Sequence, residues 1–213
     1  MEILIADDHS VVRRGLRALL ESHKDWRVCG EAANGIEAVE MAKKWRPDAV
    51  VMDITMSELN GVEATRQIRK ISPETEILIL SMHDSEPLLQ RGLQAGARGY
   101  ILKDDADKNL LAAVEAISKR ERYLSPKIMQ AVDRGKIRLD AENAEYPGNR
   151  LSARQREIVQ LLAEGKTNKE AATILNISAK TVETHRAHIM LKLGLRSVTE
   201  LVHYAVRNHL VKQ

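Results

Sequence analysis

Five polar groups stand at the ends of four short apolar segments in this sequence. They are, with the segments in parentheses, Asp7 and Asp8 (Ile3–Ala6), Asp53 (Ala49–Met52), Ser81 (Ile77–Ser81) and Lys103 (Gly99–Leu102). A short apolar run bounded by turn residues is typical of a strand buried on both faces of a parallel sheet. Because ligands bind beyond the carboxyl ends of such strands, we expect these groups to lie together at one rim of a sheet.

The grouping predicts a particular chemistry. Carboxylates that crowd together repel one another, and a cation relieves the repulsion. Mg²⁺ fits best, because it binds one or two carboxylates and keeps water molecules that phosphate oxygens can replace. A carboxylate, Mg²⁺ and a lysine are also the groups used in phosphoryl transfer to an aspartate. This part of the chain is therefore expected to bind Mg²⁺ and to accept a phosphoryl group.

Helical patterns alternate with the apolar segments, to which Arg27–Ala32 adds a fifth. The patterns run from Val12 to Leu20, Ile36 to Trp45, Val62 to Ile71, Leu88 to Leu93 and Leu110 to Ile117. Regular alternation of strands and helices predicts βαβ units with right-handed crossovers. We predict an α/β fold, a five-stranded parallel, doubly wound sheet with helices on both faces.

Residues 1 to about 120 resemble the receiver domain of bacterial two-component response regulators. The residues that carry the resemblance are Asp7, Asp8, Asp53, Ser81 and Lys103. The resemblance implies a flavodoxin-like fold in which Asp53 is the phosphorylation site. It also implies that Asp8 binds Mg²⁺ directly, that Asp7 acts mostly through water, and that the backbone carbonyl of Thr55 completes the protein ligands.

The same resemblance implies roles around the phosphoryl group. Lys103 would pair with the phosphoryl oxygens and Ser81 would donate its hydroxyl to them. Tyr100 would be an aromatic switch that turns inward when Ser81 moves. Two positions depart from the family, which usually has proline at the positions of Ser57 and Asp104. We expect a less rigid loop at Ser57 and a trans peptide bond before Asp104, because a cis bond is costly without proline.

Each of these groups also has an ordinary structural interpretation. Asp7 and Asp8 could cap the first helix, as could Ser10. Lys103 by itself would be a surface lysine, and Tyr100 would be a packing residue of the sheet. His185 and His188 could form a metal pair but lack a third ligand, and the other histidines are scattered without metal-ligand spacing. The site interpretation is preferred because the acidic and basic groups occur together.

The charge of the chain is unevenly distributed. The 213 residues have a formal net charge of +3, but residues 1–120 carry 17 Lys and Arg against 20 Asp and Glu, whereas residues 149–213 carry 11 against 5. A basic terminal part indicates a polyanionic partner. With few aromatic residues, single-stranded nucleic acid is disfavoured.

Cysteine usage and hydropathy bear on the location of the protein. Cys29 is the sole cysteine, which excludes an intrachain disulfide and suits a reducing compartment. It is expected to be a buried apolar filler. The start of the sequence is too short and too acidic for a signal peptide, and no apolar run is long enough to span a bilayer. We expect a cytoplasmic protein without a membrane partner.

Residues 121–148 are interpreted as a partly helical linker. Ser125 and Pro126 predict the start of a helix that extends to Val132 or beyond. Arg134 to Asn149 is mostly charged and polar, which predicts a tether that ends in a flexible link.

Residues 149–213 contain three signals for the start of a helix. Ser152 and Thr167 each open a capping box, and Ser178 is a plausible cap for a third helix. Gly165 and Gly194 stand where helices should end. Two helices joined by a short turn in a basic domain indicate a helix-turn-helix.

This part resembles the LuxR-type helix-turn-helix module. The carrying segments are Leu151–Glu157, Ala163–Glu170 and Ser178–His185. Together the two parts resemble a response regulator of the NarL/FixJ type. The resemblance implies double-stranded DNA as a partner, a sensor histidine kinase as the phosphoryl donor, and a homodimer that forms on activation.

Helical periodicity separates two faces of the third helix in this module. Residues that pack inward are expected to be Val182, His185, Ile189 and Leu193. Residues that face the DNA groove are expected to be Lys180, Glu183, Thr184 and Ala187. Glu183 is suited to cytosine, and Thr184 or Ala187 to a thymine methyl. Lys180, Thr181 and Lys169 are expected at phosphates.

The last helix, about Val198 to Asn208, is expected to expose Val202, Ala205 and Val206, and by resemblance to form the dimer surface.

We interpret the chain as a DNA-binding transcriptional regulator switched by Mg²⁺-dependent phosphorylation of Asp53, and not as an enzyme. One alternative is an aspartate-nucleophile phosphohydrolase, but Thr55 stands where such enzymes have a second aspartate as general acid. The other is a DNA binder that does not depend on phosphorylation.

Overall fold

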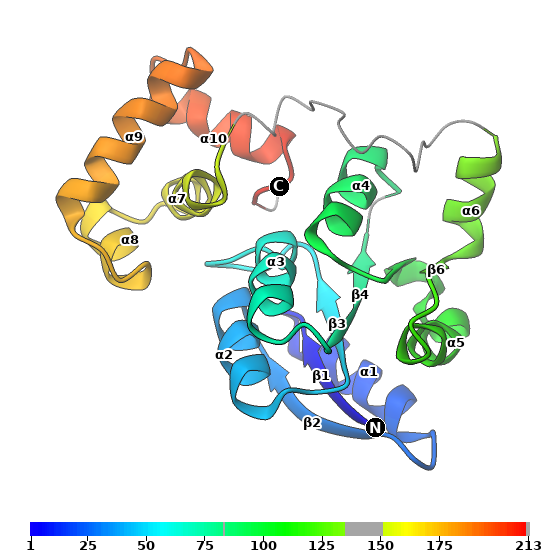
Figure 1. Cartoon of the computed structure of the whole chain (residues 1–213). Coiled ribbons are helices and arrows are strands. Elements are labelled where there is room, and N and C mark those ends of the chain that lie inside the picture. The colour runs from blue at the N-terminus through cyan, green and yellow to red at the C-terminus, as the bar shows by residue number, and fades with distance from the viewer. Residues whose placement is uncertain (83, 135–150, 212–213) are drawn as a thin grey trace.

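The computed structural model describes residues 1–82, 84–134 and 151–211 (Figure 1). Its strands are β1 (Glu2–Ala6), β2 (Arg27–Ala32), β3 (Ala49–Asp53), β4 (Glu76–Ser81), β5 (Gly99–Leu102) and β6 (Tyr123–Leu124). Its helices are α1 (Ser10–Glu21), α2 (Gly35–Trp45), α3 (Gly61–Ile71), α4 (Glu86–Ala95), α5 (Ala106–Ser118), α6 (Pro126–Asp133), α7 (Ala153–Ala163), α8 (Asn168–Ile174), α9 (Ala179–Leu193) and α10 (Val198–Arg207), with a 3₁₀ turn, η1 (Lys103–Asp105).

The strands form one parallel sheet in the order β2-β1-β3-β4-β5-β6. The expected α/β fold is confirmed, but the expectation of five strands is wrong. The sixth strand is only two residues long, and it pairs Tyr123 with Gly99 and Leu124 with Tyr100. It has no apolar run of its own, so its strand character comes from the neighbouring edge rather than from its own sequence.

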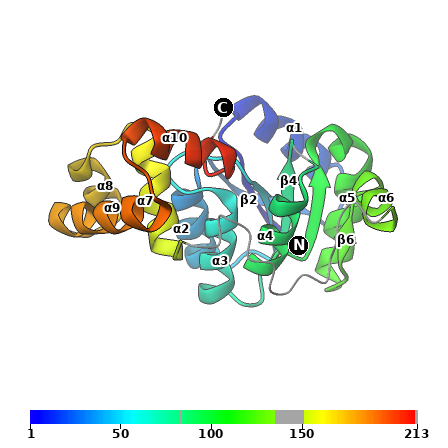
Figure 2. The ribbon, with the colours of Figure 1, turned by 90° about the horizontal axis from the view of Figure 1, so that it is seen from above.

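Helices cover both faces of the sheet (Figure 2). One face packs against α2, α3, α4 and α6, which contribute residues such as Ala42, Ile68, Leu89 and Ile128. The other face packs against α1 and α5, which contribute Leu20 and Val114 among others. β3 and β4 are buried along their whole length, as the continuous apolar runs predict.

The linker prediction is partly within the described residues. The expected helix after Ser125 is confirmed as α6, with Pro126 in its first turn. The expected tether from Arg134 to Asn149 lies outside the described residues from position 135 onward.

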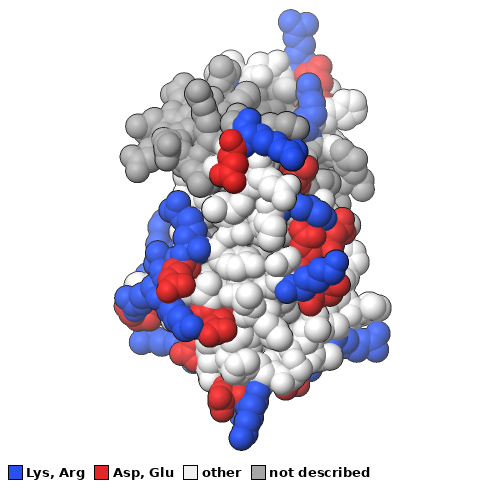
Figure 3. Space-filling view, turned by 90° about the vertical axis from the view of Figure 1, so that its right-hand side faces the viewer, with Lys and Arg blue, Asp and Glu red and all other residues white. Residues whose placement is uncertain are grey.

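On the face that carries α5 and α6, basic and acidic side chains alternate around an uncharged centre (Figure 3).

The second group of helices, α7 to α10, has its own apolar core around Ile158, Leu161, Val182 and Ile189. The three expected caps are confirmed, because the side chains of Ser152, Thr167 and Ser178 each accept the expected backbone hydrogen bond. Gly165 and Gly194 both have a positive φ, as the ends of α7 and α9 require.

The helices α7 to α10 meet the part of the chain that contains the sheet where α7 packs beside α3 (Figures 1 and 2). In the described residues, no helix is long and apolar enough to cross a membrane.

Candidate functional site

The carboxyl ends of β1, β3 and β5 bring three charged groups into contact. The Lys103 ammonium lies 2.6 Å from Asp7 Oδ2 and 3.0 Å from Asp53 Oδ2. The parallel register explains the meeting, because Ala6 pairs with Met52 in the neighbouring strand and Asp53 therefore ends its strand beside Asp7. Lys103 is the residue directly after β5, and its side chain reaches both aspartates.

Burial governs the electrostatics of this cluster. Asp53 is 1% exposed, and burial, with the charges of Asp7 and Asp8 against it, raises its pKa to about 6 although Lys103 opposes the shift. Burial alone would lower the pKa of Lys103, but Asp53 and Asp7 together outweigh it and the net pKa is raised. Lys103 is therefore a cation near neutral pH, and Asp53 is the group whose charge is costly.

One more side chain joins the acidic groups. His9 Nδ1 lies 3.2 Å from Asp7 Oδ1 and 2.9 Å from Asp8 Oδ1. Single ligand atoms of Asp7, Asp8, His9 and Asp53 all lie within 4.8 Å of one another. Sequence reasoning missed His9, and the signal that could have found it is its place directly after the two aspartates.

The donor set fits a hard divalent cation. Asp53 Oδ1 is buried and has no hydrogen-bond partner in the described residues, so one carboxylate oxygen is left for a ligand. Asp8 remains partly exposed, with a side-chain exposure of 20%, which leaves room for water on one side. Carboxylate oxygens with water are the environment that Mg²⁺ prefers.

The capping interpretation of the first aspartates is wrong. α1 begins at Ser10 with His9, not an aspartate, as its N-cap residue. The Asp7 carboxylate instead accepts from the backbone N–H of His9 and from Lys103. Asp7 is therefore part of the charged cluster.

The loop after β3 lies tightly against the phosphoacceptor candidate. Thr55 is half-buried and Ser57 is exposed. At Gly61, the first residue of α3, an added Cβ would lie only 1.9 Å from the carbonyl oxygen of Asp53, so only glycine fits. The Gly61 N–H donates to the carbonyl of Ile54 at 2.8 Å. The start of α3 is thereby fixed to the end of β3.

Ser81 ends β4, and Tyr100 lies in the neighbouring strand β5, where it pairs with Ile79, two residues before Ser81. Ser81 is 1% exposed and Tyr100 is fully buried. Burial raises the pKa of the Tyr100 phenol, and a hydrogen bond with Ser81 partly opposes this rise. The ring thus occupies an inward position in this structure. The peptide bond between Lys103 and Asp104 is trans, as expected.

Cys29 is half-buried rather than fully buried, and its thiol donates to the carbonyl of Ile3. Burial raises the pKa of this thiol.

The third helix of the second domain, α9, has the two faces expected from its periodicity. Val182 and Ile189 are buried, and His185 and Leu193 are half-buried beside them. The opposite face of α9 is exposed, and its residues are Lys180, Thr181, Glu183, Thr184 and Ala187. Lys169, at the start of α8, is exposed as well. Lys180 and Glu183 form an exposed ion pair of 3.0 Å.

The expectation for α10 is wrong at one position. Val202 and Val206 are half-exposed, but Ala205 is fully buried. Ala205 is one turn after Leu201 and shares its inward face, where both belong to the core of the domain. A surface on α10 is therefore built by Val202 and Val206 without Ala205.

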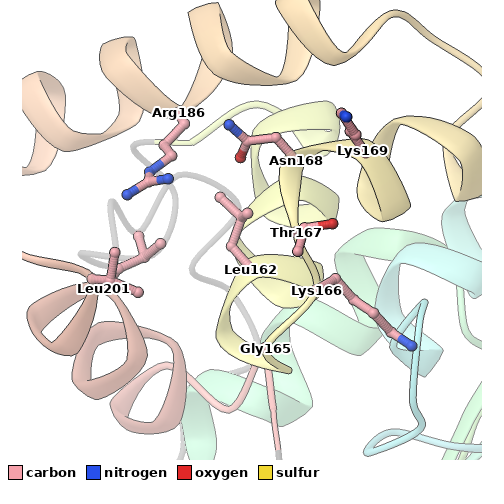
Figure 4. A pocket seen from close by; sticks show the side chains of 9 residues that line it. Leu162, Gly165, Lys166, Thr167, Asn168, Lys169, Arg186 and Leu201 are labelled. Atoms are coloured by element: carbon pink, nitrogen blue, oxygen red, sulfur yellow. The ribbon is translucent and has the colours of Figure 1, made fainter.

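A cavity of about 490 Å³ lies between the end of α7 and the starts of α8 and α10 (Figure 4). Lys166, Lys169 and Arg186 contribute to its lining, with Leu162 and Leu201 as its apolar part. In Figure 4, Arg186 extends from α9 toward Leu201, whereas Lys166 points away.

Two family models match the chain. The model described as "Response regulator receiver domain" matches residues 3–115. The model described as "Bacterial regulatory proteins, luxR family" matches residues 149–205. The matches cover the cluster around Asp53, the helices α7 to α9 and most of α10.

Three similar proteins support the family matches, and two of them cover all or nearly all of this chain. The Oxygen regulatory protein NreC of Staphylococcus aureus (strain bovine RF122 / ET3-1) is 42% identical over 216 residues, which is 100% of both chains. A two-component response regulator of the LuxR family from Aurantimonas sp. SI85-9A1 has a TM-score of 0.61 and 38% identity over 63% of this chain and 96% of its own. RcsB from Salmonella enterica serovar Typhimurium, bound to promoter rprA in the presence of phosphomimetic BeF3-, has a TM-score of 0.61 and 27% identity over 96% and 98%. The chain belongs to the response regulators that join an N-terminal receiver domain to a LuxR-type helix-turn-helix domain.

Proposed function

We propose that this response regulator is switched by phosphorylation of Asp53 and that the switch controls its binding to double-stranded DNA. The observation that carries the proposal is the contact of Lys103 with both Asp7 and Asp53 at the carboxyl edge of the sheet. A buried aspartate with a raised pKa, one free oxygen and an adjacent ammonium is suited to act as a nucleophile.

In the proposed reaction a sensor histidine kinase carries the phosphoryl group on a histidine. A carboxylate oxygen of Asp53 forms a bond to phosphorus, the P–N bond breaks, and the leaving imidazole keeps the electron pair and takes up a proton. Lys103 stays within reach of the phosphoryl oxygens and offsets their charge. The acyl phosphate that results is the signalling state of the protein.

Mg²⁺ would be held by Asp8, Asp53 and the Thr55 carbonyl, with Asp7 acting through water. When bound, it neutralises the crowded carboxylates and the incoming phosphoryl charge. Asp7 and Lys103 orient each other across the site. His9, beside Asp7 and Asp8, limits how far these two carboxylates can turn.

Ser81 and Tyr100 are proposed to report the reaction. Ser81 would move its hydroxyl from Tyr100 to the phosphoryl group, which changes the hydrogen bond that now joins the two residues. The result is a shift in the populations of two existing arrangements.

The second domain, proposed as residues 149–213, follows a linker of residues 121–148 and the receiver domain of residues 1–120. The exposed face of α9 would read the major groove through Glu183, Thr184 and Ala187. Phosphate contacts are assigned to Lys169, Lys180 and Thr181. Val202 and Val206 are proposed to pair two copies so that the dimer reads two half-sites.

The test is to treat the chain with acetyl phosphate and Mg²⁺ and to measure its intact mass. We expect one added phosphoryl group on the wild type and none on Asp53→Asn. The same samples are then incubated with fragmented genomic DNA, and the bound fragments are sequenced. The proposed coupling would be contradicted if phosphorylated and unmodified wild type recovered the same fragments equally. That contradiction would also require that the two forms have the same oligomeric state in solution.

A further inference from the structure

The start of α1 holds an imidazole beside the acidic cluster. His9 is the N-cap residue of α1, and its carbonyl accepts from the Arg13 N–H at 3.1 Å. Its own backbone N–H donates to Asp7 Oδ1 at 2.8 Å. Because both backbone groups of His9 are bonded, the positions that its side chain can reach are limited. The Nδ1 atom of the ring lies 2.9 Å from Asp8 Oδ1 and 3.2 Å from Asp7 Oδ1.

The cluster therefore offers one nitrogen ligand beside three carboxylates. Single ligand atoms of Asp7, Asp8, His9 and Asp53 lie within 4.8 Å of one another. Lys103 pairs with one oxygen of Asp7 and one of Asp53, at 2.6 and 3.0 Å. The second oxygen of Asp53, Oδ1, is buried and has no hydrogen-bond partner in the part of the chain that the structure describes. Since a buried polar atom without a partner is costly, Asp53 Oδ1 is an independent sign of a cation at this place.

The spacing of the nitrogen and its nearest carboxylate oxygen suits direct coordination. Ligand atoms at about 2.1 Å from an octahedral ion lie about 3.0 Å from their neighbours. The observed distance between His9 Nδ1 and Asp8 Oδ1 is 2.9 Å. The His9 side chain is 57% exposed, so water can carry the ring proton from Nδ1 to Nε2, and Nδ1 then offers its lone pair.

A nitrogen ligand selects among divalent ions. Mg²⁺ prefers oxygen ligands and keeps several water molecules, so an imidazole adds little to its binding. Co²⁺, Ni²⁺ and Zn²⁺ bind imidazole well, and they bind mixed nitrogen and oxygen sites more tightly than the harder Mn²⁺ does. An imidazole among the carboxylates of this cluster should therefore strengthen the binding of these three ions more than the binding of Mg²⁺.

We propose that His9 is a metal ligand and that, with Asp8 and Asp53, it binds a divalent transition-metal ion of the group Co²⁺, Ni²⁺ and Zn²⁺. This ion competes with Mg²⁺, because both ions need the carboxylates of Asp8 and Asp53. The inference rests on the metal site of the proposed function, and it adds that His9 determines the selectivity of that site among divalent ions.

The test uses full-length variants of His9 and Co²⁺ as the probe ion. His9→Gln keeps an N–H donor for the carboxylates but has no nitrogen lone pair for a metal, and His9→Ala removes both. His203→Gln, at an exposed position of α10, is the matched control. Asp53→Asn tests whether Co²⁺ and Mg²⁺ share one site.

The first readout is the affinity of each protein for Co²⁺ and for Mg²⁺, measured by calorimetry. Loss of a partner that only supports a metal ligand costs about 10- to 100-fold in affinity, so loss of a direct ligand should cost at least about tenfold. We expect the ratio of Co²⁺ affinity to Mg²⁺ affinity to fall by at least this factor in His9→Gln and His9→Ala. The ratio should stay at the wild-type value in His203→Gln, and Asp53→Asn should weaken the binding of both ions.

The second readout is the proton NMR spectrum of the protein with Co²⁺. This ion is paramagnetic, and it shifts the ring protons of an imidazole bound directly to it far outside the ordinary range. The shifted ring signals should be present in the wild type and in His203→Gln, and absent in His9→Gln. A histidine that only donates a hydrogen bond to the carboxylates would support both ions alike and would leave the affinity ratio unchanged.

The outcomes separate the two proposals. The role of His9 is wrong if its variants weaken Co²⁺ and Mg²⁺ by the same factor, if the shifted ring signals persist in His9→Gln, or if Asp53→Asn binds Co²⁺ as the wild type does. A wild type that binds neither ion contradicts the metal site of the proposed function as well. A wild type that binds both ions but takes no phosphoryl group contradicts the proposed function alone. If His9→Ala does not fold, as judged by circular dichroism, His9→Gln decides by the same criteria.

Discussion

Arg156 of α7 and Glu63 of α3 form an ion pair that is buried between the two domains. Their side-chain exposures are 10% and 1%, and a second bond joins Arg156 Nη2 to Glu63 Oε2 at 3.3 Å. Glu63 also pairs with Arg66 at 2.8 Å. Burial at this depth makes the pair sensitive to the loss of either partner, since a lone buried charge is far more costly than a paired one.

Arg156→Ala should release the domain contact. Because Arg66 still neutralises Glu63, we expect a loss of about 2 to 4 kcal/mol in the free energy of unfolding, at or below the usual cost of breaking a buried pair. Hydrogen exchange at the amides of Glu58 and Asn60 should accelerate, since their acceptors are on α7. Lys119→Ala, which breaks an exposed pair with Glu115, is the control and should change neither quantity. Slow exchange at these amides in an Arg156→Glu, Glu63→Arg double variant would support the role of the ion pair in the domain contact. Exchange in Arg156→Ala at the wild-type rate would refute that role.

The raised pKa of Asp53 predicts a dependence of stability on pH. Between its ordinary value near 3.8 and its folded value of about 6, the folded state binds more protons than the unfolded state. The free energy of unfolding of the metal-free wild type should therefore fall as pH rises through this window, by about 2 to 3 kcal/mol. Asp53→Asn lacks this loss, so urea titrations should show it to be more stable than the wild type at pH 7 and closely similar at pH 4. Equal stability of the two proteins at pH 7 would show that Asp53 is not held at a raised pKa.

Mg²⁺ should stabilise the wild type through its acidic cluster. A ligand that binds only the folded state adds about 2.7 kcal/mol at a hundred times its dissociation constant, so the melting temperature should rise as Mg²⁺ is added. Asp8→Asn and Asp53→Asn should lose most of this rise. Asp107→Asn, at an exposed position of α5, should keep it. A rise of equal size in all four proteins would place the cation elsewhere.

The exposed face of α9 should separate affinity from sequence preference. Lys169→Ala should weaken binding to all DNA sequences alike and reduce the slope of log affinity against log salt by about 1. Glu183→Ala should instead relax the base preference at one position, at a cost of about 1 to 3 kcal/mol on the preferred sequence. The measurement is a binding titration on a randomised DNA library at several salt concentrations. Loss of the salt slope in Glu183→Ala, or a changed base preference in Lys169→Ala, would reverse the two assignments.

The elements that position the cluster could be predicted because their signals are local. β2 and β5 begin and end where their apolar runs do, and the caps at Ser152, Thr167 and Ser178 follow from side chains that bond three residues away. β6 could not be predicted, because two residues carry no periodicity and the strand exists only through pairing with β5. Ala205 was misplaced for a related reason, since a small residue is compatible with either face of a helix.

Hydrophobic periodicity and the family motifs were enough to predict five of the six described strands, the helices α7 to α9 and the charged residues that stand at the ends of strands. Three features depend on the packing of distant segments: Lys103 reaches both Asp7 and Asp53, His9 joins the cluster, and Gln160 and Arg156 are buried. In sequence Gln160 and Arg156 look like polar residues of a solvated helix. Their burial depends on α3 and the loop before it, about 100 residues earlier in the chain, and no local pattern encodes a contact between two surfaces that far apart.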